Sequence, residues 1–392
     1  MPERSAVVFG AGRIARGFVG HLLGMDGYTT TFVDVDPRLV EQLEAAGRYT
    51  VHIMGAPEKS SVVENVSAIR PDSPELADRL LAAEIVFISV GGANLHGVAD
   101  TLAGALVPRL EQTGEPLNII VCENWQAAGR KLRDALAARW RAMGMEFPEE
   151  RIGVAESTIM RSAVDATAEQ LADDPLAKQS QDYWSLPVDA DALVTPLRGP
   201  EYVEAVHGFS HALKRKLFIY NGGNATISYL GLLKGHDLLS EAANDPDIES
   251  VARTFHAEVG QALTRTLGFD AMEQEAFAAR ALAKFQNRSI VDPLSRQVRD
   301  PLRKLGREDR LVGAALFMLD AGVVPNSAAL AIRAALEHRN PEDPSAVELA
   351  GLVEQLGVAG ALAEVAGIPV VHPLVDLVMA KTPALANFRP NN

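Results

Sequence analysis

The stretch SAVVFGAGRIARGFVGHLL, residues 5–23, predicts the fold of the N-terminal half. A short apolar run rich in valine ends at a glycine, and apolar residues with helical spacing follow it. Between the two lies a G-x-G-x-x-A motif, in which the first glycine allows a tight turn and the second lets the backbone approach a pyrophosphate. The free N–H groups of the helix that follows can bind the phosphates. The candidate cofactor-binding residues of this turn are Gly10, Ala11, Gly12, Arg13 and Ile14.

An acidic residue follows the motif at the expected distance. Asp34 ends the second strand-like run, TTTFVDVD, 22 residues after Gly12. A carboxylate at this point binds the adenosine ribose hydroxyls and repels a 2′-phosphate, so the pattern predicts NAD in preference to NADP. The alternative is that Asp34 is a turn residue and that the glycines serve only a strand-to-helix corner. Strand, helix and acid occur in register, which favours the cofactor site.

Strand and helix patterns continue to alternate after this point. The apolar runs 84–92, 117–124 and 151–158 read as buried strands, and 37–47 and 129–143 read as helices. This alternation predicts a Rossmann-like, doubly wound parallel sheet, in which ligands lie at the carboxyl ends of the strands. Gly91 and Asn124 end two of these runs and are candidates for contacts with the cofactor. The alternatives are an ordinary turn for Gly91 and a helix N-cap for Asn124.

The second half of the chain reads as helical. Helix-like patterns span residues 201–235, 247–268, 272–287, 307–322, 327–339 and 346–357. We therefore expect an α/β protein with an NAD-binding Rossmann-like domain at 1–193 and a mostly α-helical substrate and catalytic domain at 194–392. We expect the active site between these two domains.

Composition limits the classes of partner. The net charge of −14 disfavours nucleic acid and anionic membrane surfaces as partners, so an anionic ligand requires a local basic cluster. The only cysteine, Cys122, excludes an internal disulfide framework and indicates a reducing compartment. Inside its strand it reads as a small buried residue. No uninterrupted run of about 18 apolar residues occurs, so we expect no membrane span. We predict a cytoplasmic monomer or small homo-oligomer.

The stretch KLFIYNGGNATISYLG, residues 216–231, places polar groups in an apolar helical pattern. In an α-helix, Asn221 lies about 140° and Asn224 about 80° from Lys216, so all three can line one pocket. An apolar pocket disfavours the charged form of Lys216 and makes it a candidate general base. The alternative is a solvated lysine beside an interhelical asparagine network. Glycines 222 and 223 allow another backbone or a ligand to come close.

Several motifs resemble the polyol-specific long-chain dehydrogenases, and the mannitol-1-phosphate 5-dehydrogenase branch most of all. The lysine and first asparagine of 216–224 match a K-x4-N-x2-H motif, and VCENW resembles the C-E-N motif of that family. The segment RQVRDPLRKLGREDRLVG is similar to its R-x-x-R-x-P-L-R-K-L segment. The resemblance covers nearly the whole chain. The segments that carry it are residues 7–23, 121–125, 216–224, 227–236, 296–313 and 340–357.

The resemblance implies a mechanism. Lys216 corresponds to the general acid–base of the family, and Asn221 and Asn124 correspond to the residues that flank the reacting oxygen. Hydride is then expected to pass between a sugar-alcohol carbon and nicotinamide. The family uses no metal, which agrees with the lack of a His/Cys ligand cluster in the sequence.

Two positions depart from the family pattern and concern the substrate. Asn224 stands where the family has histidine, and Met160 stands where it has the aspartate of Val-Asp-Arg. A thioether in place of a carboxylate leaves a polyol hydroxyl unpaired, at a cost of ~1–3 kcal/mol. The pattern therefore predicts a shorter or less hydroxylated substrate and mannitol 1-phosphate equally well.

A set of basic residues can bind an anionic group of the substrate. We expect one or two of the set to do so, because arginine binds phosphate with two parallel hydrogen bonds. The alternative for each is a surface ion pair. The set is Arg161, Arg296, Arg299, Arg303 and Lys304.

Three functions stay open from the sequence. The first is an NAD-dependent dehydrogenase that acts on a phosphorylated or otherwise anionic polyol or ketone, including less hydroxylated phosphates and phosphonates. The second is an epimerase or isomerase that uses tightly bound NAD. The third is a catalytically inactive NAD-binding protein, against which the retention of Lys216, Asn221 and Asn124 argues.

Overall fold

The computed structural model describes residues 4–125, 127–197 and 201–389. It divides into two compact units, Met1–Ser210 and His211–Asn392, which we call the N-terminal unit and the C-terminal unit. The division into domains predicted after residue 193 stays a prediction. Each unit has its own hydrophobic core, so each is described by itself.

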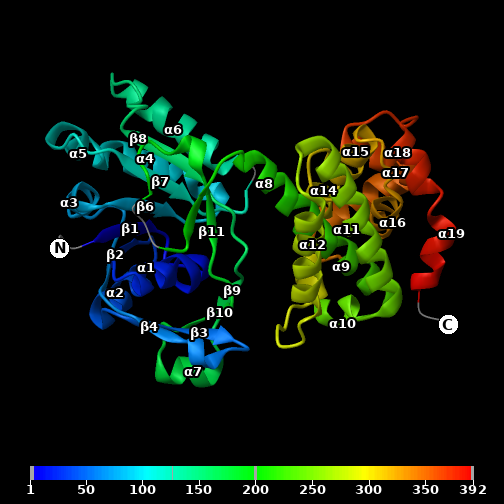
Figure 1. Cartoon of the computed structure of the whole chain (residues 1–392), viewed down its shortest axis with the longest axis horizontal. Helices are drawn as coiled ribbons and strands as arrows, with labels where there is room; N and C mark the ends of the chain where they lie inside the picture. The colour runs from blue at the N-terminus through cyan, green and yellow to red at the C-terminus, as the bar shows by residue number, and fades with distance from the viewer. Residues whose placement is uncertain (1–3, 126, 198–200, 390–392) are drawn as a thin grey trace. The chain divides into compact units, whose positions relative to one another are not determined.

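The N-terminal unit is built on a parallel sheet with the strand order β5-β2-β1-β6-β7-β8 (Figure 1). The first strand therefore lies in the middle, and the order reverses beside it, as in a doubly wound nucleotide-binding fold. This confirms the predicted fold class. The strands are β1 (Ser5–Phe9), β2 (Thr29–Val33), β5 (Val66–Ile69), β6 (Ile85–Ile88), β7 (Leu117–Val121) and β8 (Ile152–Glu156).

Helices cover both faces of this sheet. Successive strand residues point to opposite sides, and here the residues on both sides are apolar and need to be buried. Val8 and Phe32 belong to one buried cluster, and Val7 and Val86 belong to the cluster on the other face. The helices are η1 (Ala15–Gly20), α1 (His21–Met25), α2 (Pro37–Ala46), α3 (Leu76–Ala82), α4 (Leu95–Ala105), α5 (Val107–Gln112) and α6 (Ala128–Ala142). Of these, η1 is a π-helix, in which hydrogen bonds run from residue i to i+5.

The same unit contains strands that the patterns did not predict. A second sheet has the order β4-β3-β10-β9, and two further strands, β11 and β12, pair in parallel. β12 (Val203–Val206) lies where a helix was expected from residue 201, so that part of the prediction is wrong. Most of these strands have only three or four residues, which leaves little periodicity to recognise, whereas the alternating burial of β3 is a strand signal that was missed. The remaining elements are β3 (Tyr49–Met54), η2 (Pro57–Lys59), β4 (Ser61–Val63), η3 (Gly92–Asn94), β9 (Ala163–Asp165), α7 (Ala168–Asp173), β10 (Lys178–Gln181), β11 (Leu186–Asp189) and η4 (Ala190–Ala192).

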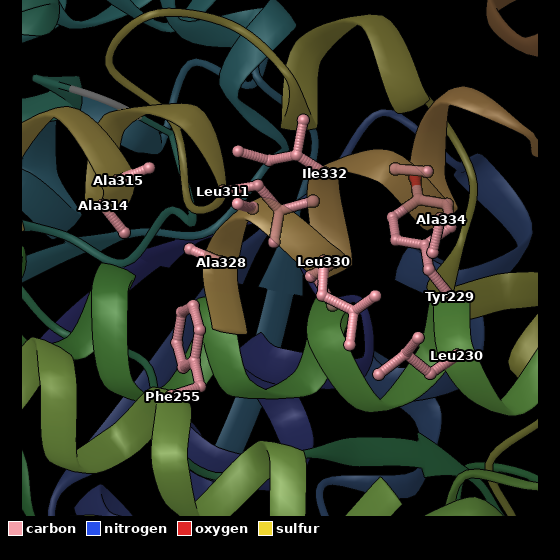
Figure 2. Packing of buried hydrophobic residues seen from close by; sticks show 14 of the residues in the cluster. Tyr229, Leu230, Phe255, Leu311, Ala314, Ala315, Ala328, Leu330, Ile332 and Ala334 are labelled. Carbon is pink, nitrogen blue, oxygen red and sulfur yellow. The ribbon is translucent and has the colours of Figure 1, made fainter. Parts of the chain in front are cut away.

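The C-terminal unit is helical, as predicted. Its central helix, α9, packs against α10, α11, α13 and α16. Figure 2 shows side chains of α9, α11, α15 and α16 in this core, among them Leu230, Phe255, Ala314 and Ile332. The elements are α8 (Phe209–Lys216), which begins at the boundary of the two units, η5 (Leu217–Gly222), α9 (Gly223–Lys234), α10 (Leu239–Ala243), α11 (Pro246–Leu267), α12 (Ala271–Gln286), α13 (Leu294–Gln297), α14 (Pro301–Lys304), α15 (Val312–Asp320), α16 (Asn326–Leu336), α17 (Pro344–Ala366), α18 (Pro373–Met379), α19 (Thr382–Leu385) and η6 (Ala386–Phe388).

One helix in the described part of the chain, α17, is long and apolar enough by length and composition alone to cross a membrane. Its regular geometry breaks at Gly357, where φ is 70° and ψ is 172°. It packs against α14, α16 and α18 of the same unit. Core helices of soluble proteins pass the same test, so a single helix of this kind is weak evidence for a membrane span.

Candidate active site

The glycine turn after β1 has the geometry of a phosphate-binding turn. Gly10 has φ of +89°, and a Cβ atom on it would lie 2.1 Å from the carbonyl oxygen of Ser89, so only glycine fits. A Cβ atom on Gly12 would meet no described atom within 4 Å. The packing of the turn therefore does not require glycine at this position, whereas close approach of a ligand does. These residues fit a dinucleotide pyrophosphate.

Asp34 lies beside this turn, at the carboxyl end of β2. Its Oδ2 accepts a hydrogen bond from the N–H of Ala11 at 2.6 Å, and its Oδ1 accepts one from the N–H of Asp36 at 2.9 Å. The carboxylate thus ties the second strand to the glycine turn. The nearby Arg13 is exposed and forms an ion pair with Asp165 at 3.5 Å. Contacts of Asp34, Arg13 and the half-buried Ile14 with a cofactor stay predictions.

The turns after β6 and β7 are linked by a glutamate that the sequence analysis did not single out. Glu123 Oε1 accepts a hydrogen bond from the N–H of Gly91 at 2.7 Å, and burial raises the pKa of this carboxyl. The link holds the turn at Gly91 beside the segment that carries Asn124. The N-cap alternative for Asn124 is wrong, because α6 begins at Ala128 and no described side chain caps it.

The lone cysteine is inert. Cys122 is buried, and its sulfur accepts a hydrogen bond from Ser157 Oγ at 3.3 Å. Burial raises the pKa of the thiol to about 12, so the thiolate is scarce at neutral pH. This confirms Cys122 as a small buried residue.

Arg161 lies inside the N-terminal unit. Its side chain is 1% exposed and its Nη2 donates to His21 Nδ1 at 2.8 Å. The guanidinium carbon lies 4.7 Å from the ring centroid of Trp184, and burial lowers the pKa of Arg161 to about 10. Next to it, the sulfur of Met160 accepts a hydrogen bond from Tyr183 Oη at 3.5 Å. The predicted substrate contacts of Met160 and Arg161 stay predictions.

The segment that carries the predicted catalytic residues of the C-terminal unit contains a π-helix. Lys216 precedes η5, Asn221 lies within it, and Asn224 lies in the first turn of α9. A π-helix turns by only about 80° per residue instead of ~100°. Asn221 therefore lies roughly 50–70° from Lys216 and Asn224 roughly 10–30° from it on the other side. The π-helix gathers the three side chains within an arc of about 80°, which is much tighter than expected for an α-helix.

Neighbouring helices explain the two glycines in this motif. A Cβ atom on Gly222 would lie 2.7 Å from Phe255 Cζ and 2.9 Å from the carbonyl oxygen of Arg310. A Cβ atom on Gly223 would lie 2.3 Å from His256 Nε2. The glycines therefore admit the aromatic rings of α11 and another backbone segment. His256 was missed in the sequence because nothing local relates it to η5, which lies more than 30 residues earlier.

Burial and nearby charges change the acidity of Lys216. Its pKa is lowered to about 7, first by burial and then by the charges of Lys284 and Arg310. Lys284 lies on α12, and its ammonium nitrogen is 5.3 Å from the ring centroid of Tyr220, four residues after Lys216. The pKa of Lys284 is itself lowered to about 8 by burial. A lysine of this kind is part neutral at pH 7 and can accept a proton.

The basic residues between α13 and α14 differ in their environments. Arg296 pairs with Asp292 at 2.9 Å, and Arg303 pairs with Asp300 at 2.6 Å, so both form surface ion pairs. Lys304 is buried, donates to the carbonyl oxygen of Arg299, and has its pKa lowered to about 7 by burial. Substrate contacts of Arg299, Arg303 and Lys304 stay predictions. Among the residues that the structure describes, no group of three or more His, Cys, Asp or Glu could hold a metal ion.

Comparison with protein-family models gives two matches in chain order. Residues 4–196 match the mannitol dehydrogenase Rossmann domain, and residues 209–380 match the mannitol dehydrogenase C-terminal domain. Together they cover most of the chain. They confirm the resemblance that the motifs indicated.

Individual proteins agree with these matches. A mannitol-1-phosphate 5-dehydrogenase of Bacillus licheniformis is 34% identical over 379 residues, which cover 96% of this chain and 98% of the relative. A solved structure of a D-sorbitol dehydrogenase in substrate-free form has a TM-score of 0.80 at 16% identity, over 99% of this chain and 95% of that chain. A Pseudomonas fluorescens mannitol 2-dehydrogenase, solved with NAD and D-mannitol, has a TM-score of 0.76 at 18% identity, over 98% and 93% of the two chains. At these identities the two structures support the fold.

Proposed function

The chain belongs to the mannitol dehydrogenase family, and from this premise we propose that it is an NAD-dependent dehydrogenase of a phosphorylated polyol. It oxidises one carbinol carbon, or reduces the corresponding ketone, in a substrate such as mannitol 1-phosphate or fructose 6-phosphate. The relative that is 34% identical over nearly the whole chain is a mannitol-1-phosphate 5-dehydrogenase, which supports this substrate class. The predicted cytoplasmic location and oligomeric state stay predictions.

One observation carries the proposal: Lys216, Asn221 and Asn224 lie within one narrow arc, and the pKa of Lys216 is lowered to about 7. In the oxidation, neutral Lys216 takes the hydroxyl proton while the carbinol carbon loses hydride. Amide N–H groups of Asn221 and Asn124 donate to the oxygen and stabilise the alkoxide character that develops there. In the reverse direction, charged Lys216 returns the proton. We propose that the reaction requires no metal, because a lysine can fill both proton roles.

The N-terminal unit would bind the cofactor. Gly10 and Gly12 shape the phosphate turn, Asp34 would hold the ribose hydroxyls, and Gly91 would lie against the nicotinamide half. Nicotinamide supplies one property, the capacity to accept and return hydride. The acidic side chain of Asp34 beside Ala11 supports NAD over NADP, because a 2′-phosphate there meets a negative charge.

We propose that at least one of Arg299, Arg303 and Lys304 contacts the phosphate group of the substrate, and Arg303 would have to leave its ion pair with Asp300 to do so. Arg161 need not contribute to phosphate binding, because its guanidinium group already stacks on Trp184. Asn224 and Met160 replace a histidine and an aspartate of the family pattern, both of which would contact the substrate. We therefore expect altered recognition of the hydroxyl groups, and a less hydroxylated phosphate or phosphonate is the alternative substrate.

The test is a substrate screen read by the absorbance of NADH. Fructose 6-phosphate and less hydroxylated keto-phosphates and phosphonates are tested with NADH and NADPH, and mannitol 1-phosphate is tested with NAD⁺ and NADP⁺, each with and without EDTA. We expect turnover of at least one phosphorylated substrate, a ketone with NADH or an alcohol with NAD⁺, unchanged by EDTA. Turnover of unphosphorylated polyols alone, or loss of activity in EDTA, contradicts the proposal. Product formation without net change in NADH indicates an epimerase or isomerase instead.

Two variants examine hydroxyl recognition in the same assay. Asn224→His, alone and with Met160→Asp, restores the family residues at both positions. If these positions contact hydroxyl groups, the ratio of kcat/KM for fructose 6-phosphate to that for a less hydroxylated substrate increases, and more so in the double variant. If wild type already turns over fructose 6-phosphate efficiently and Asn224→His changes nothing, the altered-substrate alternative is wrong.

A further inference from the structure

The backbone of the π-helix η5 accepts a hydrogen bond from a side chain of another helix. In a π-helix the backbone hydrogen bonds run from i to i+5, and a carbonyl oxygen has a second lone pair that can accept a hydrogen bond from outside the helix. The carbonyl oxygen of Ile219, in the middle of η5, accepts one hydrogen bond from the N–H of Gly223 and a second from His256 Nε2 at 3.0 Å. His256 lies on α11 and its side chain is 5% exposed.

The surroundings leave the imidazole little freedom. Its neighbour Phe255 fills the space that a side chain on Gly222 would need, and the ring of His256 fills the corresponding space at Gly223. The adjacent rings of Phe255 and His256 thus pack against the adjacent glycines 222 and 223, where the π-helix ends and α9 begins. Any side chain on Gly223 would push His256 off the carbonyl group.

The contact lies between the residues that the π-helix brings together. Ile219 is three residues after Lys216 and two before Asn221. In a continuous α-helix Asn221 would lie about 140° from Lys216, and in η5 it lies roughly 50–70° away. The carbonyl that His256 binds is inside the segment where this difference arises.

We propose that His256 is a positioning residue, which holds η5 in its π-helical register so that Asn221 and Asn224 face the same substrate as Lys216. It touches neither substrate nor cofactor and acts through the carbonyl group of Ile219. This inference rests on the proposed function, since the register matters for catalysis only if Lys216 and Asn221 are the reacting groups.

Electrostatics support a permanent role for this contact. Burial lowers the pKa of His256 to about 4. The groups that face η5 from other elements are His256 of α11, Lys284 of α12 and Arg310 before α15, and from the same segment Lys216 and Tyr220. Because His256 is neutral at pH 6–9, the contact should not contribute a titration to the pH profile of the enzyme.

The experiment compares His256→Leu, which cannot donate, with His256→Gln, whose amide N–H can. We expect kcat to fall about 10²-fold in His256→Leu, as for a misplacement of about 1 Å, and to recover in part in His256→Gln. The affinity for NADH, measured by fluorescence titration, should be unchanged in both. Equal losses in both variants contradict a role for the hydrogen bond.

A double-mutant cycle separates alignment from general damage. If His256 aligns Asn221 with Lys216, then Asn221→Ala lowers kcat by about 10²–10³-fold in wild type and by less than ~10-fold in His256→Leu. Additive losses overturn the inference. The matched control is His338→Leu, which removes another buried histidine of the same unit, one with no described hydrogen-bond partner, and should leave kcat unchanged.

A structural readout keeps this inference apart from the proposed function. A crystal structure of His256→Leu should show i to i+4 hydrogen bonds across residues 217–222, and one of His256→Gln should retain the i to i+5 pattern. If wild type turns over no phosphorylated substrate, the proposed function fails, while these structures still decide the role of His256 in the register. An unchanged π-helix in His256→Leu overturns the inference.

Discussion

The two units each contain a π-helix, and the two are built alike. In η1 the carbonyl oxygen of Arg16 accepts a hydrogen bond from Tyr49 Oη at 2.9 Å, and in η5 that of Ile219 accepts one from His256. A glycine faces the donor in both. A Cβ atom on Gly20 would lie 2.4 Å from Tyr49 Oη, as one on Gly223 would lie 2.3 Å from His256 Nε2.

The difference between them lies in their surroundings. Every residue of η1 is buried, whereas η5 has a half-buried polar face that includes Tyr220 and Asn221 and follows Lys216. In η1 the wider turn of the π-helix serves to pack the helix against the strands and loops of its unit. In η5 the same type of helix orients the side chains to which we assign the reaction. In this chain the half-buried polar face distinguishes η5 from η1.

The largest expected effect is the loss of Lys216, the proposed general base, directly before η5. Lys216→Ala should lower kcat by about 10²–10⁴-fold, because that is the usual contribution of acid–base catalysis. The control is Lys214→Ala, an exposed lysine two residues earlier whose ammonium lies over Phe317. Steady-state kinetics and NADH titration are the measurements, and NADH affinity should not change. A kcat within tenfold of wild type contradicts the role of Lys216.

Alanine substitutions at Gly20 and Gly223 test whether the two π-helices differ in function. Gly20→Ala and Gly223→Ala should each destabilise the protein by about 1–3 kcal/mol, because a methyl group enters a filled space. In urea unfolding both should therefore lose stability. Only Gly223→Ala should also lower kcat about 10²-fold in the remaining folded enzyme, because it displaces groups next to the reacting side chains.

The control for both is Gly351→Ala on α17, where a Cβ atom would meet no described atom within 4 Å. It should be neutral or stabilise by ~0.5–1 kcal/mol. Equal kcat losses in Gly20→Ala and Gly223→Ala would break the distinction between the two π-helices.

A smaller effect is expected from the charge that faces η5. Of the nearby charges, that of Lys284 lowers the pKa of Lys216 most. Lys284→Met removes this charge, so the pKa of Lys216 should rise from about 7 by about one unit. The neutral fraction of Lys216 at pH 7 then falls, and the oxidation slows by up to ~10-fold there and recovers at higher pH. The measurement is the pH profile of kcat/KM. Lys284→Arg should retain the wild-type profile, and an unshifted profile in Lys284→Met rules out the coupling.

The smallest effect concerns the N-terminal unit. Asp34→Ala should reduce the preference for NADH over NADPH by about 10-fold, since it removes a ribose partner and a negative charge. The matched control, Asp36→Ala, removes the N-cap of α2 and should lower stability by ~1 kcal/mol without changing the preference. The ratio of the two kcat/KM values is the measurement. A native preference for NADPH would contradict the assignment of Asp34.

The sequence by itself determined the fold class and the ends of many helices. The glycine motif, the buried strand runs and Asp34 are local patterns, and each reads out the geometry of the backbone that contains it. Helix α11 begins and ends within one residue of the predicted range, because Pro246 and Gly268 mark its ends. The apolar pattern around Lys216 predicted a lowered pKa, and its burial together with the charges of the distant Lys284 and Arg310 lowers this pKa in the structure.

Tertiary structure decided the register of η5 and the partners around it. The choice between i+4 and i+5 hydrogen bonds depends on His256, Phe255 and two glycines that meet only after α11 packs against η5. The strand β12 forms where a helix was expected, because β11 offers it a parallel edge. Arg161 and Lys284 likewise take their environments from distant elements. Periodicity records what one segment prefers, whereas these features depend on contacts between segments far apart in the chain.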